Sequence, residues 1–419
     1  MTLQDSGPSA ARDAHNVQAD LRAVGVLSGA AVNVRVMRLL HTSDWHIGRS
    51  LHGADLLADQ ERVLTGLADL IRVESVDVVV VSGDIYDRAI PSAAATVVLD
   101  TVLTTLRATG AQLVITPGNH DSSIRLAYAA GLLAANGVHL RTNVAQLAEP
   151  VLIEDEHGPV GIYGIPYLEP DLVKHALGVA QARGHTDVLR AAMDQIRADR
   201  DRRGLTRAVV LAHAFVAGGA RGDSERDISV GGVDVVPADV FADVDYVALG
   251  HLHRPQEITS AIHYSGSPLA YSFTEADQVK SVKLVDIGAD GLAGVAVHGL
   301  DRPRGLVTLT GTLDDVIGEP SYGAHLEDYV SVQLLDSVRP VDAMRRLRAR
   351  FPYCVHLDWV PVVDATADPR SYAERIVGRT DLGIVTDFVQ HVRATPATGA
   401  ETELLSAALV AGRTREVSS

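Results

Sequence analysis

Five short apolar segments of this chain are each followed by residues of types that commonly bind divalent metal ions in proteins. They are rich in β-branched residues and bounded by turn residues, the pattern of strands buried on both faces. They lie at about 34–40, 76–81, 113–115, 208–212 and 245–249. Helical periodicity over 63–71 and 91–106 separates the first three segments. The alternation of strand and helix predicts an α/β fold with parallel strands covered on both faces.

The polar residues that follow these strands are expected to meet, because parallel strands present their carboxyl ends at one edge of a sheet. Nitrogen and oxygen ligands without thiolate suit manganese, iron, zinc or nickel. Seven ligands are too many for one ion and suit two, the arrangement that hydrolyses phosphoesters with its ions ~3.5–4 Å apart. The seven candidate metal ligands are Asp44, His46, Asp84, Asn119, His213, His251 and His253.

Asp84 is the expected bridging ligand, because a carboxylate has two oxygens and its strand is central in the predicted order. The other ligands divide between the ions, with Asp44, His46 and His253 on one and Asn119, His213 and His251 on the other.

His120 directly follows a candidate ligand and is not needed as a ligand itself. It is a candidate catalytic residue that would steady the phosphate oxygens or protonate the leaving alkoxide. Asp121 is a candidate to orient it.

The composition limits the partners and the compartment. The formal net charge of −16 argues against non-specific attraction to nucleic acid or to an anionic membrane. Two divalent ions would still leave the site cationic, since Asp44 and Asp84 cancel only half of their charge. The sequence has no apolar run near the ~18 residues of a membrane helix. The one cysteine, Cys354, excludes an internal disulfide and predicts a cytoplasmic protein.

The chain of 419 residues is long enough for several domains. Residues 1–36 are interpreted as a disordered extension or as the result of a mis-assigned start codon, because Met37 lies inside the first predicted strand. Residues 37–300 form the expected metal-binding domain, in which further strands are predicted over 160–165 and, at a sheet edge, over 262–264.

The character of the sequence changes after about residue 300. Residues 301–370 form a predicted small domain with strands over 307–309, 329–335 and 354–360 and a helix over 341–351, whose arginines most simply form a solvated face. Residues 371–419 form a predicted helical tail with helices over 382–392 and 401–410.

The five ligand blocks, in this order, resemble the calcineurin-like metallophosphoesterase superfamily. The stretches 42–48 (TSDWHIG), 248–254 (ALGHLHR) and 264–268 (YSGSP) are more narrowly similar to the SbcD family of bacterial DNA-repair nucleases. The resemblance implies a layered α/β/β/α sandwich, a small α+β capping domain and a C-terminal helical tail.

That resemblance implies a manganese-dependent nuclease with two bound ions. It would act as a 3′→5′ exonuclease on double-stranded DNA and as an endonuclease on single strands and hairpins. The nuclease would be a homodimer that joins an SbcC-type coiled-coil ATPase in a heterotetramer. Residues 301–370 would cap the DNA, and the tail would dock the ATPase. Some relatives have a histidine where this chain has Asp87, which leaves the role of that position open.

Two other functions remain open at this point. One is a phosphodiesterase of the same superfamily that acts on a small molecule such as a cyclic nucleotide, although it would not need residues 300–419. The other is a non-catalytic adaptor whose metals only stabilise it, although His120 would then have no purpose.

Overall fold

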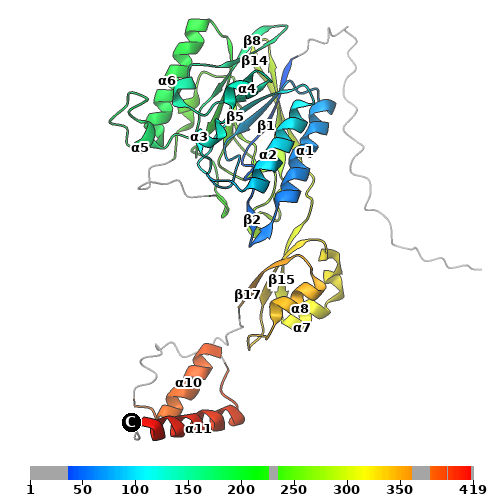
Figure 1. The fold of residues 1–419 in the computed structure, drawn as a ribbon, viewed down its shortest axis with the longest axis vertical. Coiled ribbons are helices and arrows are strands. Elements are labelled where there is room, and N and C mark those ends of the chain that lie inside the picture. Colours follow the sequence, from blue (N-terminus) through cyan, green and yellow to red (C-terminus); the bar gives the residue numbers. More distant parts are fainter. Residues whose placement is uncertain (1–35, 226–234, 361–377, 394, 417–419) are drawn as a thin grey trace, which may run out of the picture. The chain divides into compact units, whose positions relative to one another are not determined.

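The five predicted strands lie in the middle of two six-stranded sheets (Figure 1). The protein is described by a computed structural model over residues 36–225, 235–360, 378–393 and 395–416. The first sheet has the order β14-β13-β1-β4-β5-β6. Its strands are β1 (Met37–Thr42), β4 (Val78–Ser82), β5 (Gln112–Thr116), β6 (Val138–Leu140), β13 (Ser281–Gly288) and β14 (Gly291–Gly299).

The second sheet has the order β11-β12-β10-β9-β8-β7. Its strands are β7 (Val151–Asp155), β8 (Gly158–Gly164), β9 (Arg207–His213), β10 (Tyr246–Gly250), β11 (Gln256–Thr259) and β12 (Ile262–Tyr264). The central strands of each sheet are parallel, whereas β13, β14, β7 and β11 pair antiparallel.

The alternation of side chains along the strands builds the layers. In β4, Val79 and Val81 pack on the side of the helices, whereas Val78 and Val80 enter the apolar cluster between the sheets. The side chains of β9 alternate in the same way in the second sheet, and Val209 and Leu211 lie in the apolar cluster between the sheets. Both faces of each sheet are therefore covered, and the protein has the expected α/β/β/α sandwich.

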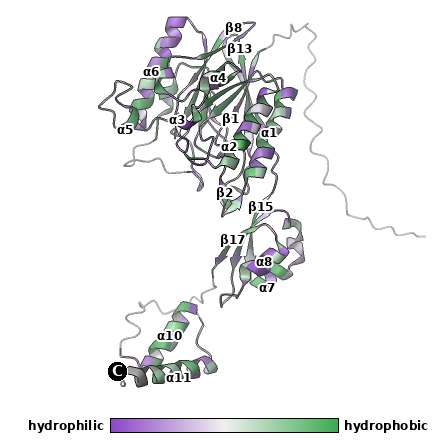
Figure 2. Cartoon of the chain, viewed as in Figure 1, coloured by the Kyte–Doolittle hydropathy of each residue, from purple (hydrophilic) through white to green (hydrophobic). Residues whose placement is uncertain are grey.

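Amphipathic helices cover the outer faces, as the green and purple sides of α1 and α6 show (Figure 2). α1 (Leu57–Val73) and α2 (Ala93–Arg107) pack on the first sheet, and α6 (His185–Arg203) packs on the second. Ser92 caps α2 by accepting a hydrogen bond from the Ala95 amide. Among the described residues, no helix is both long and apolar enough to cross a membrane.

Residues beyond about 300 form smaller elements. Three parallel strands in the order β15-β16-β17 alternate with helices, so this part is itself α/β. Its elements are β15 (Leu306–Gly311), α7 (Leu313–Gly318), β16 (Tyr329–Leu334), α8 (Ala343–Arg350) and β17 (Cys354–Trp359). Further along the chain are α10 (Asp381–Arg393) and α11 (Gly399–Glu416). The remaining elements are β2 (Ser50–Leu51), β3 (Ala54–Asp55), α3 (Ser123–Leu126), α4 (Ala130–Ala134), α5 (Pro170–Val173) and the short 3-10 helices Val144–Gln146, Ala238–Phe241, Phe273–Glu275 and Pro320–His325.

The structure differs from the predicted elements at the edges of the two sheets. β12 was expected at a sheet edge, but β11 pairs with its outer side and takes the edge. The antiparallel hairpin of β13 and β14, which extends the first sheet beyond β1, was not predicted. The expected extension at residues 1–36 lies outside the described residues except for Val36.

The two sheets are in direct contact at the carboxyl ends of β4 and β10. A Cβ atom added to Gly250 would lie 1.7 Å from the Ser82 carbonyl oxygen, so only glycine fits there. The Ser82 hydroxyl donates a hydrogen bond of 2.8 Å to the Ala248 carbonyl across the same gap. This close approach brings the loops of both sheets to one place.

A substitution of Gly250 by alanine should therefore destabilise the fold. We expect Gly250→Ala to lower the free energy of unfolding by about 1–3 kcal/mol or more, because the backbone of β4 cannot move without separating the sheets. Gly66→Ala is the matched control, since Gly66 is exposed on α1 with nothing within 4 Å of the added atom. The control should gain about 0.5–1 kcal/mol. Urea denaturation measures both, and equal stability of the two variants would contradict the packing argument.

Candidate metal centre

All seven predicted ligands gather at the carboxyl ends of the central strands. Asp44 and His46 follow β1, Asp84 follows β4, and Asn119 follows β5. His213 ends β9, while His251 and His253 follow β10. Six of the seven side chains are buried, and Asn119 is half-buried.

One group of ligand atoms belongs to the first predicted ion. Asp44, His46 and His253 offer ligand atoms that all lie within 4.8 Å of one another. The Nε2 atoms of His46 and His253 face each other at 3.0 Å. The structure thus brings together the three residues that the sequence assigned to one ion.

The second group shares a carboxylate with the first. The Asp84 Oδ2 atom lies 3.5 Å from His46 Nε2 and 3.4 Å from His213 Nε2, between the two sets of ligands. The Asn119 Oδ1 atom lies 2.9 Å from the same His213 nitrogen. This position of Asp84 is the one that a bridging ligand needs.

Asp44 lies closer to the second group than the sequence suggested. It forms a further compact group with Asp84 and His213, and it accepts hydrogen bonds from the His251 amide at 3.0 Å and the Ser43 hydroxyl at 2.6 Å. The two ligand sets are therefore neighbours rather than separate clusters.

The spacing of these atoms fits divalent cations. Two ligand atoms ~2.1 Å from one ion in tetrahedral or octahedral geometry are ~3.0–3.4 Å apart, close to the separations above. Within the seven candidate ligands, three buried polar atoms have no hydrogen-bond partner among the described residues, namely His46 Nδ1, Asn119 Nδ2 and His251 Nε2. The orphaned His251 Nε2 is an atom that a cation would satisfy, so the donor set suits a two-metal centre.

Strained backbone and glycines make this convergence possible. Asp44, His46, Asp84 and His251 all have positive φ angles, which cost free energy in residues other than glycine and cluster at functional sites. A Cβ atom on Gly118 would lie 2.1 Å from Asp84 Oδ1. The glycine before Asn119 therefore lets the β5 loop approach the central carboxylate.

Burial and mutual charge shift the pKa values of the carboxylates in opposite directions. Burial raises the Asp44 pKa to about 6, although His213 and His253 counteract it. Burial also opposes ionisation of Asp84, but the neighbouring His213 and His46 outweigh it and hold the Asp84 pKa well below its usual range. Asp84 is therefore the more strongly ionised of the two carboxyl groups.

His120 lies beside the ligands, and its orienting partner differs from the prediction. Its Nδ1 atom lies 2.8 Å from the Asp87 carbonyl oxygen, to which it donates as Nδ1–H. Asp121, the expected partner, instead accepts hydrogen bonds from the Ile85, Tyr86 and Gly118 amides. The Asp121 carboxylate therefore connects the loop after β4 with the loop after β5, whose amides it binds.

His120 also approaches the metal ligands more closely than expected. It offers a ligand atom within 4.8 Å of those of His46 and Asp84, and its ring centroid lies 4.7 Å from that of His46. The Nε2 atom, left free by the bond to Asp87, is available for a reacting group.

The sequence did not indicate several residues that support the ligands. Gln60 of α1 donates to the carbonyl groups of Trp45 and His46 and accepts from the Gly48 amide. Ser224, Glu225, Glu275 and Lys280 surround His253. None of them lies beside a ligand in the sequence, so no local pattern could have identified them.

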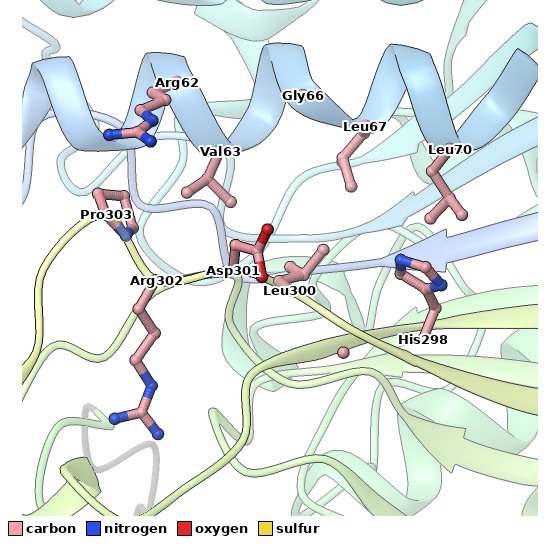
Figure 3. Close-up of a pocket in the computed structure, with 11 residues that line it drawn as sticks. Arg62, Val63, Gly66, Leu67, Leu70, His298, Leu300, Asp301, Arg302 and Pro303 are labelled. Atoms are coloured by element: carbon pink, nitrogen blue, oxygen red, sulfur yellow. The ribbon is translucent and has the colours of Figure 1, made fainter. Parts of the chain in front are cut away.

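A pocket of about 490 Å³ lies elsewhere, between α1 and residues 298–303 (Figure 3). Val63, Leu67 and Leu70 form its apolar side, and Arg62 and Arg302 also line it. None of its lining residues is a candidate metal ligand, so this pocket is separate from the metal centre.

Comparison with a protein family agrees with this chemistry. The model of the family described as calcineurin-like phosphoesterase matches residues 37–255, which hold all the candidate ligands. Among solved structures, protein TT1561 of Thermus thermophilus is 13% identical, covers 63% of this chain and 99% of its own, and has a TM-score of 0.37. A dimetal phosphatase from Danio rerio is 13% identical, covers 64% of this chain and 99% of its own, and has a TM-score of 0.36.

The His213 pKa predicts that metal binding depends on pH. Burial opposes the charged ring, but the Asp84 carboxylate outweighs it and raises the His213 pKa to about 9. A metal ligand must lose this proton, so Mn²⁺ affinity should rise about tenfold per pH unit between about pH 6 and pH 8, where His213 is still protonated before binding. Calorimetric titration with Mn²⁺ measures this slope. An affinity that is constant over this range would contradict it.

Proposed function

The chain belongs to the calcineurin-like phosphoesterase family, and on that premise we propose that it is a manganese-dependent DNA nuclease. The observation that carries the proposal is the buried convergence of Asp84 with the two ligand sets. Such a centre serves phosphodiester hydrolysis in general. The choice of DNA rests on the resemblance of residues 42–48 and 248–268 to the SbcD nucleases and on the elements beyond residue 300.

Two divalent ions, when bound, would supply an activated water and would neutralise the charge of the phosphate. The protein's own residues position the reaction. His213 is held by its Nδ1 hydrogen bond of 3.0 Å to the Ser82 carbonyl, which turns its Nε2 toward Asp84. This arrangement fixes the tautomer and orientation of a metal ligand.

His120 is the residue that we assign to proton transfer. The Asp87 carbonyl accepts the Nδ1–H, so the imidazolium form of His120 would give its second proton, from Nε2, to the leaving oxygen of the cut strand and keep the proton on Nδ1. Asp87 thus contributes its backbone, and its side chain lies 3.8 Å from His46 Nδ1 and 3.8 Å from Arg49 Nε. A histidine at position 87 is not needed for this role.

The proposal extends to partners. We propose a cytoplasmic homodimer that binds an SbcC-type coiled-coil ATPase through the helices α10 and α11, with residues 301–370 contacting the DNA. Exposed apolar side chains support the dimer, because Ile124 of α3, Leu132 of α4 and Tyr128 in the turn between these helices are 74–88% exposed. Large apolar side chains that are exposed close together in the sequence are typical of a contact surface.

A small-molecule phosphodiesterase remains the second candidate function. Its support is the metal centre itself, whose chemistry applies to the phosphodiester of a cyclic nucleotide as well as to that of DNA. The deciding assay compares Mn²⁺-dependent cleavage of hairpin DNA, with and without the SbcC-type ATPase, against hydrolysis of a cyclic nucleotide. Hydrolysis of the cyclic nucleotide alone would reject the nuclease.

Two substitutions separate metal binding from proton transfer. We expect His120→Ala to keep both ions while cleavage slows by about 10²–10⁴-fold, because a general acid is lost. Asp84→Ala should lose metal, because the bridging carboxylate is removed. Metal analysis after dialysis and a hairpin cleavage assay measure the two effects. His157→Ala, at an exposed loop position, is the control and should match the wild type. Equal metal depletion in both site variants would contradict the division of roles.

The proposed dimer is tested at the exposed apolar residue between α3 and α4. Tyr128→Asp should convert the dimer to a monomer, because a charge cannot be buried unpaired in an apolar contact. Sedimentation analysis measures the mass, and Leu172→Asp, at an exposed apolar residue of α5, is the matched control. A variant at Tyr128 that remains dimeric would place the interface elsewhere.

A further inference from the structure

The metal ligand His253 is surrounded by a buried polar network. Its Nδ1 atom lies 2.5 Å from the Ser224 hydroxyl oxygen, and that hydroxyl also contacts Glu275 Oε1. The other Glu275 oxygen accepts a hydrogen bond from Lys280, which is only 1% exposed. The network is thus a chain that runs from a buried cation to the imidazole.

The directions of these hydrogen bonds follow from the number of available protons. Glu275 is ion-paired with Lys280, so it is a carboxylate and can only accept. The Ser224 hydroxyl has one proton and must donate it to Glu275. Its oxygen can then only accept from His253, which requires the proton of that ring to be on Nδ1.

We infer that Ser224 and Glu275 form a relay that fixes the tautomer of His253 and presents its Nε2 lone pair to the metal. This inference rests on the proposed metal centre. The Nε2 atom is the one that lies 3.0 Å from His46 Nε2, inside the first ligand group. Partners of this kind, behind a ligand, orient it and strengthen its bond to the metal.

The same residue types could suggest a nucleophilic triad, but their order excludes it. In such a triad the histidine lies between the serine and the carboxylate. Here Ser224 lies in the middle and gives its proton to Glu275, so the hydroxyl is not activated by His253. Ser224 is a positioning residue.

The backbone around the relay keeps it in place. Glu225 Oε1 accepts a hydrogen bond of 2.8 Å from the His253 amide, and Lys280 donates one of 3.0 Å to the His253 carbonyl. The Ser224 carbonyl accepts from Arg49, which follows the first ligand loop. Residues 224 and 225 therefore connect the loop after β9 to both ligand loops of the first ion.

The relay is tested first in the full-length wild type without metal. Long-range ¹H–¹⁵N NMR of labelled histidines, with His253 assigned by the His253→Asn variant, reports which ring nitrogen carries the proton. A proton on Nδ1 supports the relay, and a proton on Nε2 overturns it. This measurement needs neither catalysis nor a variant at Ser224.

The second test is Mn²⁺ titration of Ser224→Ala by calorimetry. We expect one of the two binding steps to weaken about 10–100-fold, the usual effect of losing a partner behind a ligand. Ser260→Ala, at an exposed serine, should keep wild-type affinity. Unchanged affinity of Ser224→Ala would overturn the relay alone, whereas a wild type that binds no Mn²⁺ would overturn the metal centre and the relay together.

Discussion

The contact of the two sheets at Ser82 is the constraint on which the candidate centre depends. The Ser82 carbonyl accepts the Nδ1–H of His213, and the absent side chain of Gly250 lets the ends of β4 and β10 touch. Ligands from both sheets can share an ion only because this distance is short. The same contact sets the tautomer of His213. The packing of the two sheets therefore also orients a candidate metal ligand.

Burying two carboxylates together is costly, and the surrounding imidazoles reduce that cost only in part. Burial raises the Asp44 pKa, whereas His213 and His46 hold the Asp84 pKa low, so Asp44 ionises less readily than Asp84. Divalent ions would supply the missing positive charge locally. The overall charge of −16 therefore says little about the field at the site, where an anionic phosphate has to bind.

The candidate ligands could be predicted because each lies at or just beyond the end of its strand, and strand and ligand type can both be recognised locally. The support of those ligands is tertiary and could not be predicted in that way. Glu275 and Lys280 reach His253 only after the chain has formed β12 and turned back toward it. For Asp121 the sequence predicted a contact that the structure does not have. Its position next to His120 suggested a hydrogen bond between the two side chains, but its carboxylate binds backbone amides of the neighbouring loops instead.

The candidate centre suits phosphodiester hydrolysis in general, so in the proposed nuclease the selection of DNA would come from residues outside it. The arginines of α8 are poor candidates, because each already contacts a group near that helix. Arg345 pairs with Asp342, Arg346 with Asp314, and Arg348 and Arg350 donate to carbonyl groups. A DNA strand would have to replace these bonds, which offsets the gain from each phosphate contact. The α8 arginines therefore add no support to the proposed contact between residues 301–370 and DNA.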